Sequence, residues 1–246
     1  MPISLALRSR HASPQDVDSA WHETLAILNA ADAVFSTYRE DSVISRLARG
    51  EVLKKDCPPE VLEVLELGEL ARRLSDGAFD VRRPGRYGDH TLDPSGVVKG
   101  WALAGAARAI HRLPDTDFCL AAGGDMVCHT RTTAAAWRIG IEDPLDPTRV
   151  LAVVPVRNGG VATSGLTHRG DHIVDARTGA TPGALASVTV IGPDLVWADI
   201  HATAAFALGQ GARHYLAERG VDSGVLVWRD GTREVLGPVR SPGTAA

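Results

Sequence analysis

Apolar residues recur at helical spacing in several parts of the chain. Ser13 followed by Pro14 is typical of a helix start, with the serine as N-cap. Trp21, Leu25 and Leu28 then lie three or four positions apart, on one face of the expected helix. The same criteria predict helices that begin near residues 42 and 58, and helices over residues 97–110, 198–208 and 211–219.

Short apolar and β-branched runs without helical spacing predict strands. These runs cover residues 1–8, 118–122, 137–141, 150–156, 187–191 and 221–228. Residues 82–93 are rich in glycine, proline and charge and indicate a loop, and the small residues 159–165 indicate a turn between strands. Helices and strands mix without a regular βαβ rhythm, a repeat or a linker. We therefore expect one α+β domain over residues 1–240, followed by a flexible tail over residues 241–246.

Composition excludes several classes of protein. The 246 residues are 44% hydrophobic and 23% charged, which is ordinary for a globular chain. The net charge of −4 and the lack of a basic block give no electrostatic footprint for nucleic acid. The longest apolar runs are about seven residues, against about 20 for a membrane span. No secretory signal stands at the N-terminus, so we expect a cytoplasmic protein.

Standard catalytic and nucleotide-binding signatures do not occur in the sequence. It has neither GxGxxG nor GxxxxGK[ST], and neither GxSxG nor HExxH. Its three cysteines are too few for a disulfide framework and include no CxxC pair for zinc. Candidate chemistry must therefore come from less common clusters.

Asp199 and Thr203 form the first such cluster. On a helix they share one face, and their carboxylate and hydroxyl oxygens suit Mg²⁺. The alternative is purely structural, with an acidic residue favoured near a helix N-terminus and a threonine bonded back to its own helix.

Residues 163–179 form the second cluster and contain two histidines and two arginines. An arginine can pair with a phosphate, and a histidine can act as a general base near neutral pH. The alternative is a hairpin with a polar tip, closed by a turn over residues 175–179.

Three shorter segments have weaker signals. Lys99 lies just inside an expected helix start, where backbone N–H groups can hold a phosphate; an ordinary helix start capped by Asp93 or Ser95 is the alternative. Paired glycines at 123–124 allow close approach of a ligand, or make an ordinary turn. The aromatic and hydroxyl groups of residues 35–39 could contact a flat ring, or simply pack in the core.

The order of these segments is more specific than any one of them. It resembles the ApbE family, whose members are FAD:protein FMN transferases. The segments that carry the resemblance are residues 35–38, 42–47, 77–80, 93–100, 123–125, 164–179, 187–190 and 198–209. The resemblance therefore spans residues 35–209 in collinear order.

The resemblance implies an α+β fold with FAD held in a cleft between two lobes. It also implies a Mg²⁺-dependent reaction that attaches FMN from FAD through a phosphoester to a Thr or Ser hydroxyl of a target flavoprotein, and that releases AMP. Two alternatives stay open: an FAD pyrophosphatase that yields FMN and AMP, and a protein that binds or stores FAD without turnover.

Residue roles follow from the resemblance position by position. Asp199 and Thr203 match the metal-ligating residues, and the main-chain carbonyl of Val98 matches the third ligand. His172 matches the residue that we expect to activate the incoming hydroxyl. The expected FAD-binding residues are Ser36, Thr37, Tyr38, Lys99, Gly123, Gly124, Asp125 and Arg169.

Overall fold

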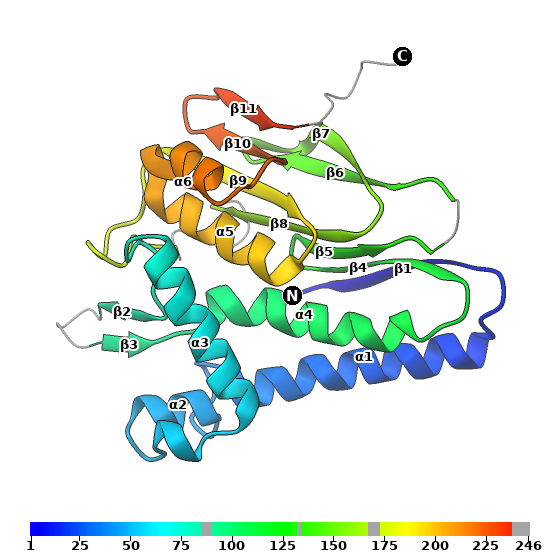
Figure 1. Cartoon of the computed structure of the whole chain (residues 1–246), viewed down its shortest axis with the longest axis horizontal. Helices are drawn as coiled ribbons and strands as arrows, with labels where there is room; N and C mark the ends of the chain where they lie inside the picture. The colour runs from blue at the N-terminus through cyan, green and yellow to red at the C-terminus, as the bar shows by residue number, and fades with distance from the viewer. Residues whose placement is uncertain (85–89, 132–133, 167–172, 238–246) are drawn as a thin grey trace.

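The computed structural model describes residues 1–84, 90–131, 134–166 and 173–237 (Figure 1). The helices of this part are α1 (Pro14–Phe35), α2 (Val43–Ala48), α3 (Pro59–Leu74), α4 (Ser95–His111), α5 (Leu195–Leu208) and α6 (Ala212–Glu218). Two short 3₁₀ helices, η1 (Lys54–Asp56) and η2 (Gly209–Gly211), connect them. The strands are β1 (Ile3–Ser9), β2 (Arg82–Pro84), β3 (His90–Leu92), β4 (Thr116–Ala122), β5 (Asp125–His129), β6 (Trp137–Asp143), β7 (Asp146–Val156), β8 (Gly159–Gly165), β9 (Leu185–Gly192), β10 (Gly224–Trp228) and β11 (Arg233–Leu236).

A seven-stranded antiparallel sheet in the order β1-β4-β5-β8-β9-β10-β11 forms the centre of the molecule. Helices α4 and α5 lie across one face of this sheet, and α1 packs along α4 (Figure 1). The β6–β7 pair is a separate two-stranded hairpin, and β2–β3 is another. This arrangement confirms the predicted α+β fold.

Alternate residues of the central strands enter two apolar layers. On β10, Leu226 belongs to the core beneath the helices, whereas Val225 and Val227 belong to a smaller core with the β6–β7 hairpin. Neighbouring side chains of a strand point to opposite faces of the sheet, so both faces of this sheet are buried. The β6–β7 hairpin therefore forms a third layer of the fold.

Local capping signals predict the helix starts well. Ser13 accepts the Asp16 N–H while Asp16 accepts the Ser13 N–H, which makes a capping box at the start of α1. Ser42 caps α2 through the Ser45 N–H. The helices expected at 97–110, 198–208 and 211–219 are confirmed as α4, α5 and α6, with α5 beginning three residues earlier.

Two expectations about connecting segments are wrong. Residues 82–93 are not wholly loop, because β2 and β3 pair there as a short hairpin. Residues 159–165 are not a turn but β8, a central strand of the sheet. The small residues serve close packing: a β-carbon at Gly160 would lie 2.4 Å from the Leu195 Cα at the start of α5.

No helix in the described ranges is long and apolar enough to cross a membrane. The tail expected over residues 241–246 lies outside those ranges.

Candidate active site

A cavity of about 260 Å³ opens where the first turns of α4 and the middle of α5 meet β5 and β8. The β6–β7 hairpin forms its opposite wall. Lys99, Asp199 and Thr203 all line this cavity, together with Gly123 and Gly124. The fold therefore brings together residues that lie about a hundred positions apart in the sequence.

Asp199 is buried on α5 and faces α4. Its side chain is 2% exposed, and its Oδ2 accepts the Gly100 N–H at 3.0 Å. The Lys99 Nζ lies 3.7 Å from the Asp199 Oδ1. Burial raises the pKa of the Asp199 carboxyl group, and the Lys99 ammonium opposes this effect. The carboxylate is thus held in place by α4 at a point where negative charge is costly.

Thr203 lies one helical turn after Asp199 and also lines the cavity. Its Oγ1 is 3.0 Å from the Oγ of Ser164 on β8. Because Asp199 and Thr203 line the same cavity, the prediction that they share one face of α5 is confirmed. The contact with Ser164 shows that the sheet orients the Thr203 hydroxyl. A threonine that bonded only to its own helix would not make this contact.

Asp125 lies directly behind this group and has no exposed surface. Its Oδ2 is 2.8 Å from the Lys99 Nζ, and its Oδ1 accepts the Thr163 N–H at 3.3 Å. Burial and the nearby Asp199 carboxylate raise the pKa of Asp125 to about 8, while Lys99 opposes them. One ammonium therefore serves two buried carboxylates.

The β4–β5 turn explains why two glycines precede Asp125. Gly123 and Gly124 have φ values of +55° and +93°, which side chains with a β-carbon rarely adopt. The turn reverses the chain in two residues and leaves bare backbone at the cavity wall. Because Gly123 and Gly124 lie in the cavity wall and have no side chains, a ligand can approach their backbone closely.

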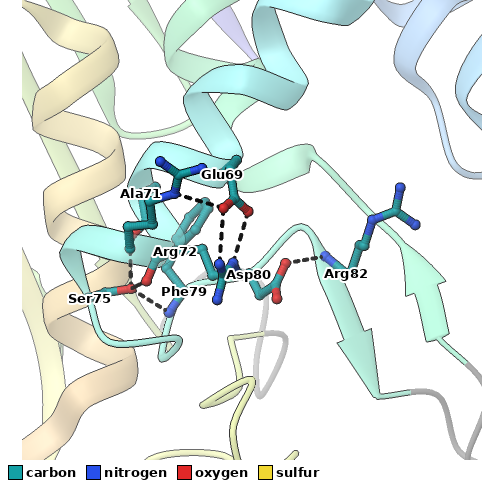
Figure 2. Close-up of polar contacts among 8 residues, drawn as sticks. Glu69, Ala71, Arg72, Ser75, Phe79, Asp80 and Arg82 are labelled. Carbon is teal, nitrogen blue, oxygen red and sulfur yellow. Dashed lines mark hydrogen bonds and ion pairs between the residues drawn. The ribbon is translucent and has the colours of Figure 1, made fainter. Parts of the chain in front are cut away.

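A hydrogen-bonded segment after α3 lines part of the cavity. Ser75 ends α3: its Oγ donates to the Ala71 carbonyl at 2.8 Å and accepts the Phe79 N–H at 3.0 Å. Asp80 accepts the Arg82 N–H at 2.7 Å (Figure 2). Phe79 and Asp80 are both lining residues. These bonds hold the backbone of this part of the cavity wall in place.

Asp93, two residues before the first residue of α4, contacts the start of this helix. The Asp93 Oδ1 accepts the Ser95 N–H at 3.0 Å, and Asp93 also forms an ion pair with Arg83. The expectation of Asp93 or Ser95 as the N-cap is wrong, because Pro94 occupies that position and Ser95 is the first helical residue; Asp93 accepts an N–H of the first turn from the residue before the N-cap. Ser95 and Gly96 line the cavity at this helix N-terminus, where the helix dipole favours an anion.

Comparison with known proteins gives a consistent result. The model of the ApbE family matches residues 2–83 and 86–225 of this chain. The chain belongs to the ApbE family. A curated relative, the FAD:protein FMN transferase of Haemophilus influenzae, is 29% identical over 260 residues, covering 80% of this chain and 75% of the relative.

Solved ApbE structures share the fold. The ApbE protein of Thermotoga maritima aligns with a TM-score of 0.81 at 21% identity, over 95% of this chain and 93% of that one. The flavinyl transferase ApbE of Pseudomonas stutzeri aligns with a TM-score of 0.75 at 21% identity, over 96% and 95%. The flavin transferase ApbE of Vibrio cholerae aligns with a TM-score of 0.76 at 18% identity, over 99% and 98%.

Some residues expected from the ApbE resemblance lie elsewhere. Ser36, Thr37 and Tyr38 follow α1 and are not among the residues that line the cavity, and the Tyr38 side chain is 98% exposed. The Ser36 carbonyl accepts the Ser42 hydroxyl at 2.7 Å, so this segment has a structural role in the turn to α2. Its contact with FAD stays a prediction.

The remaining expected site residues are Val98, Arg169 and His172. Val98 lies in the first turns of α4, next to Lys99, but does not itself line the cavity. Arg169 and His172 lie outside the described residues. The turn expected over residues 175–179 is confirmed, because Gly179 N–H donates to the Asp175 carbonyl at 2.7 Å.

Sequence reasoning missed two parts of the site. It assigned no role to Ser164, although this residue orients Thr203. It also missed the wall formed by the β6–β7 hairpin, where Ile139, Ile141 and Glu142 line the cavity. Alternation of apolar and polar residues along β6 was a usable signal for a half-buried strand, but nothing local shows which face meets the cavity.

Proposed function

We propose that this chain is a Mg²⁺-dependent flavin transferase that moves FMN from FAD to a Thr or Ser hydroxyl of a target flavoprotein. The hydroxyl oxygen attacks the FMN phosphorus, a phosphoester bond forms, and the pyrophosphate bond breaks with release of AMP. The hydroxyl proton passes to a base. FAD occupies the cavity between the helices and the β6–β7 hairpin.

One observation carries the proposal. Lys99, Asp199 and Thr203 line a single cavity, and the buried Asp125 forms an ion pair with Lys99, in a chain of the ApbE family. The curated relative named above is an FAD:protein FMN transferase. A storage protein would bind FAD but would not need two buried carboxylates beside an ammonium group, since their burial is costly.

The donor set fits Mg²⁺. Carboxylate and hydroxyl oxygens are the hard ligands that Mg²⁺ prefers, and it commonly shares its shell with water and substrate phosphate. Asp199 and Thr203 would hold the ion, with the Val98 carbonyl as a third ligand. When bound, the ion supplies positive charge that neutralises the pyrophosphate.

The chain's own residues supply orientation and charge. Gly100 fixes the Asp199 carboxylate through its N–H, and Ser164 fixes the Thr203 hydroxyl. Ser95 and Gly96 line the cavity at the N-terminus of α4, where the positive end of the helix dipole would favour a phosphate of FAD. His172 is proposed to take the proton of the acceptor hydroxyl as a general base.

The experiment follows AMP release and covalent flavin labelling. Purified protein is incubated with FAD and a candidate acceptor flavoprotein, in Mg²⁺ or in EDTA, and flavin fluorescence is read on a denaturing gel. We expect AMP and a fluorescent acceptor band in Mg²⁺ and neither in EDTA. AMP without a labelled acceptor would instead indicate an FAD pyrophosphatase, and bound FAD without AMP would refute turnover.

Asp199→Asn tests the metal ligand. The amide oxygen can still accept the Gly100 N–H, so the fold is preserved while the charge is removed. We expect a loss of about 10²-fold in Mg²⁺-dependent AMP release, equivalent to about 3 kcal/mol of transition-state stabilisation. Asp194→Asn is the matched control: it removes the same charge from the N-cap of the same helix, where asparagine also caps well. Equal activity of the two variants would contradict the assignment.

A further inference from the structure

Two cysteines lie directly opposite each other on the β4–β5 hairpin. Cys119 of β4 pairs with Cys128 of β5 in the sheet register, and their sulfur atoms are 3.7 Å apart. All three cysteines of the chain are free thiols in this structure. The third, Cys57, is elsewhere in the fold and donates to the Leu53 carbonyl at 3.5 Å. Only the hairpin pair is positioned to bond.

The turn of this hairpin fixes the geometry of the pair. Gly123 and Gly124 have the φ values of a two-residue type I′ turn, +55° and +93°. The residues that flank such a turn form a hydrogen-bonded pair, and the two kinds of pair alternate along an antiparallel ladder. Ala122 and Asp125 are the pair that flanks the turn, and Cys119 and Cys128 are the third pair beyond it. Cys119 and Cys128 therefore form a non-hydrogen-bonded pair.

This kind of pair suits a disulfide bond. In non-hydrogen-bonded pairs the Cα atoms are about 4.5 Å apart and the side chains approach most closely. Disulfides span Cα separations of about 4.4–6.8 Å. Side-chain rotation can therefore bring the sulfurs of Cys119 and Cys128 to a bond length of about 2.0 Å without a change of register.

The surroundings distinguish the two thiols. Cys128 is 2% exposed within the apolar layer beneath the β6–β7 hairpin, and Cys119 is half-buried at the edge of the same layer. The Cys128 thiol donates to the Cys119 sulfur, which lowers the pKa of Cys119. The same contact and burial raise the pKa of Cys128. Cys119 is thus both the more accessible sulfur and the one that more readily becomes a thiolate, which is the reactive form.

We propose that Cys119 and Cys128 are a redox-sensitive pair that closes to an intramolecular disulfide in the presence of hydrogen peroxide. The Cys119 thiolate attacks a peroxide oxygen; the S–O bond forms as the O–O bond breaks, and hydroxide leaves and is protonated to water. The Cys128 thiol then attacks the sulfenic sulfur, the S–S bond replaces the S–O bond, and a second water carries away the thiol proton. Two thiols are oxidised and one peroxide is reduced to two waters.

The bond would clamp the hairpin that forms part of the cavity wall. Cys119 and Cys128 flank the Gly123–Gly124 turn, and both glycines line the cavity. Oxidation therefore ties β4 to β5 next to the site. This chemistry is independent of the reaction that the site performs, so the two proposals are tested separately.

The test uses the full chain with hydrogen peroxide as the probe. After peroxide is removed, remaining thiols are blocked with iodoacetamide without reduction, and the intact mass and peptide map are measured. We expect one alkylated cysteine, Cys57, and a mass lower by two hydrogens before alkylation, with a cross-link between the peptides of Cys119 and Cys128. Dithiothreitol should restore all three thiols.

Variants show which cysteines react. Cys57→Ser should form the same cross-link, and Cys119→Ser should form none. A cross-link that involves Cys57, a bond between two chains, stable oxygen addition at one cysteine, or three thiols still reactive after peroxide would each overturn the proposal. The wild-type peptide map decides the question even if the Cys119→Ser protein does not fold.

Discussion

A methyl group added at Gly100 should push apart the two helices that hold the site. A β-carbon at this position would lie 3.0 Å from the Asp199 Cβ, 3.2 Å from its Oδ2 and 3.2 Å from the Leu195 carbonyl oxygen. Favourable contacts between carbon atoms are at about 3.5–4.0 Å. One of these neighbours is backbone and the others belong to a fully buried side chain, so α4 itself must move away from α5.

The magnitude follows from two opposing effects. Overpacking of this kind costs about 1–3 kcal/mol. Alanine favours a helix over glycine by about 1 kcal/mol. We therefore expect Gly100→Ala to lower the free energy of unfolding by about 0–2 kcal/mol, and to move Lys99 of α4 away from the Asp199 carboxylate of α5.

Gly105→Ala is the matched control because it makes the same change on the same helix. A β-carbon at Gly105 would meet no atom within 4 Å, so only the helix-propensity effect remains. It should raise the free energy of unfolding by about 1 kcal/mol. The helix-propensity effect is the same in both variants. The difference between their free energies of unfolding, about 1–3 kcal/mol, therefore measures the overpacking alone.

Urea unfolding of the two variants, followed by circular dichroism, measures this difference. Mg²⁺-dependent AMP release then reports on the site, and it should fall in Gly100→Ala and not in Gly105→Ala. If Gly100→Ala were as stable and as active as Gly105→Ala, the close approach of α4 and α5 would not be what positions Asp199, and the reasoning would be refuted.

Three other perturbations test separate parts of the structure. Ser164→Ala removes the partner of the half-buried Thr203 hydroxyl. It should lower the free energy of unfolding in urea by about 1 kcal/mol and raise the Mg²⁺ concentration needed for AMP release, and an unchanged Mg²⁺ dependence would argue against this orientation of Thr203. Burial lowers the pKa of His201 below its ordinary value of 6.5, so at acidic pH the unfolded chain binds more protons than the folded protein. The protein should therefore lose stability as the pH falls below about 6.5. Unfolding at pH 7.5 and 5.5 measures this loss, and His201→Gln should reduce it. A Cys119–Cys128 disulfide closes a loop of about ten residues and should raise the free energy of unfolding by about 2.7 kcal/mol. Unfolding of the oxidised protein with and without dithiothreitol measures this gain. If a protein shown to be cross-linked were no more stable, the bond would be strained.

Sequence alone predicts the helices because their signals are local. The N-cap at Ser13 and its partner Asp16 are three residues apart, and the apolar face of α1 repeats within a turn. Asp199 and Thr203 are likewise four positions apart, so their common face on α5 could be foreseen. Each of these features depends on residues that contact one another within the same element.

The sequence does not predict features that depend on distant parts of the chain. Gly159 and Gly160 suggest a turn because glycine weakens an isolated strand. They lie in β8 because α5 comes so close that a larger side chain at Gly160 would overlap Leu195. The contact of Ser164 with Thr203 joins residues 39 positions apart and depends on where α5 crosses the sheet. Local patterns contain no information about that crossing.

The charges at the site also explain why its residues need one another. Lys99 contributes one positive charge, and Asp125 and Asp199, when ionised, contribute two negative charges in a place with almost no access to water. Burial raises the pKa of both carboxyl groups, which means that the full charge is unfavourable without a further cation. A divalent ion at Asp199 would relieve this imbalance and favour ionisation of both groups. The same buried carboxylates that weaken the metal-free fold would therefore provide the affinity for Mg²⁺. Because the ion binds the ionised carboxylate and must displace any proton that the raised pKa retains, metal binding should stabilise the protein more as the pH rises, which thermal unfolding with Mg²⁺ and with EDTA at several pH values measures.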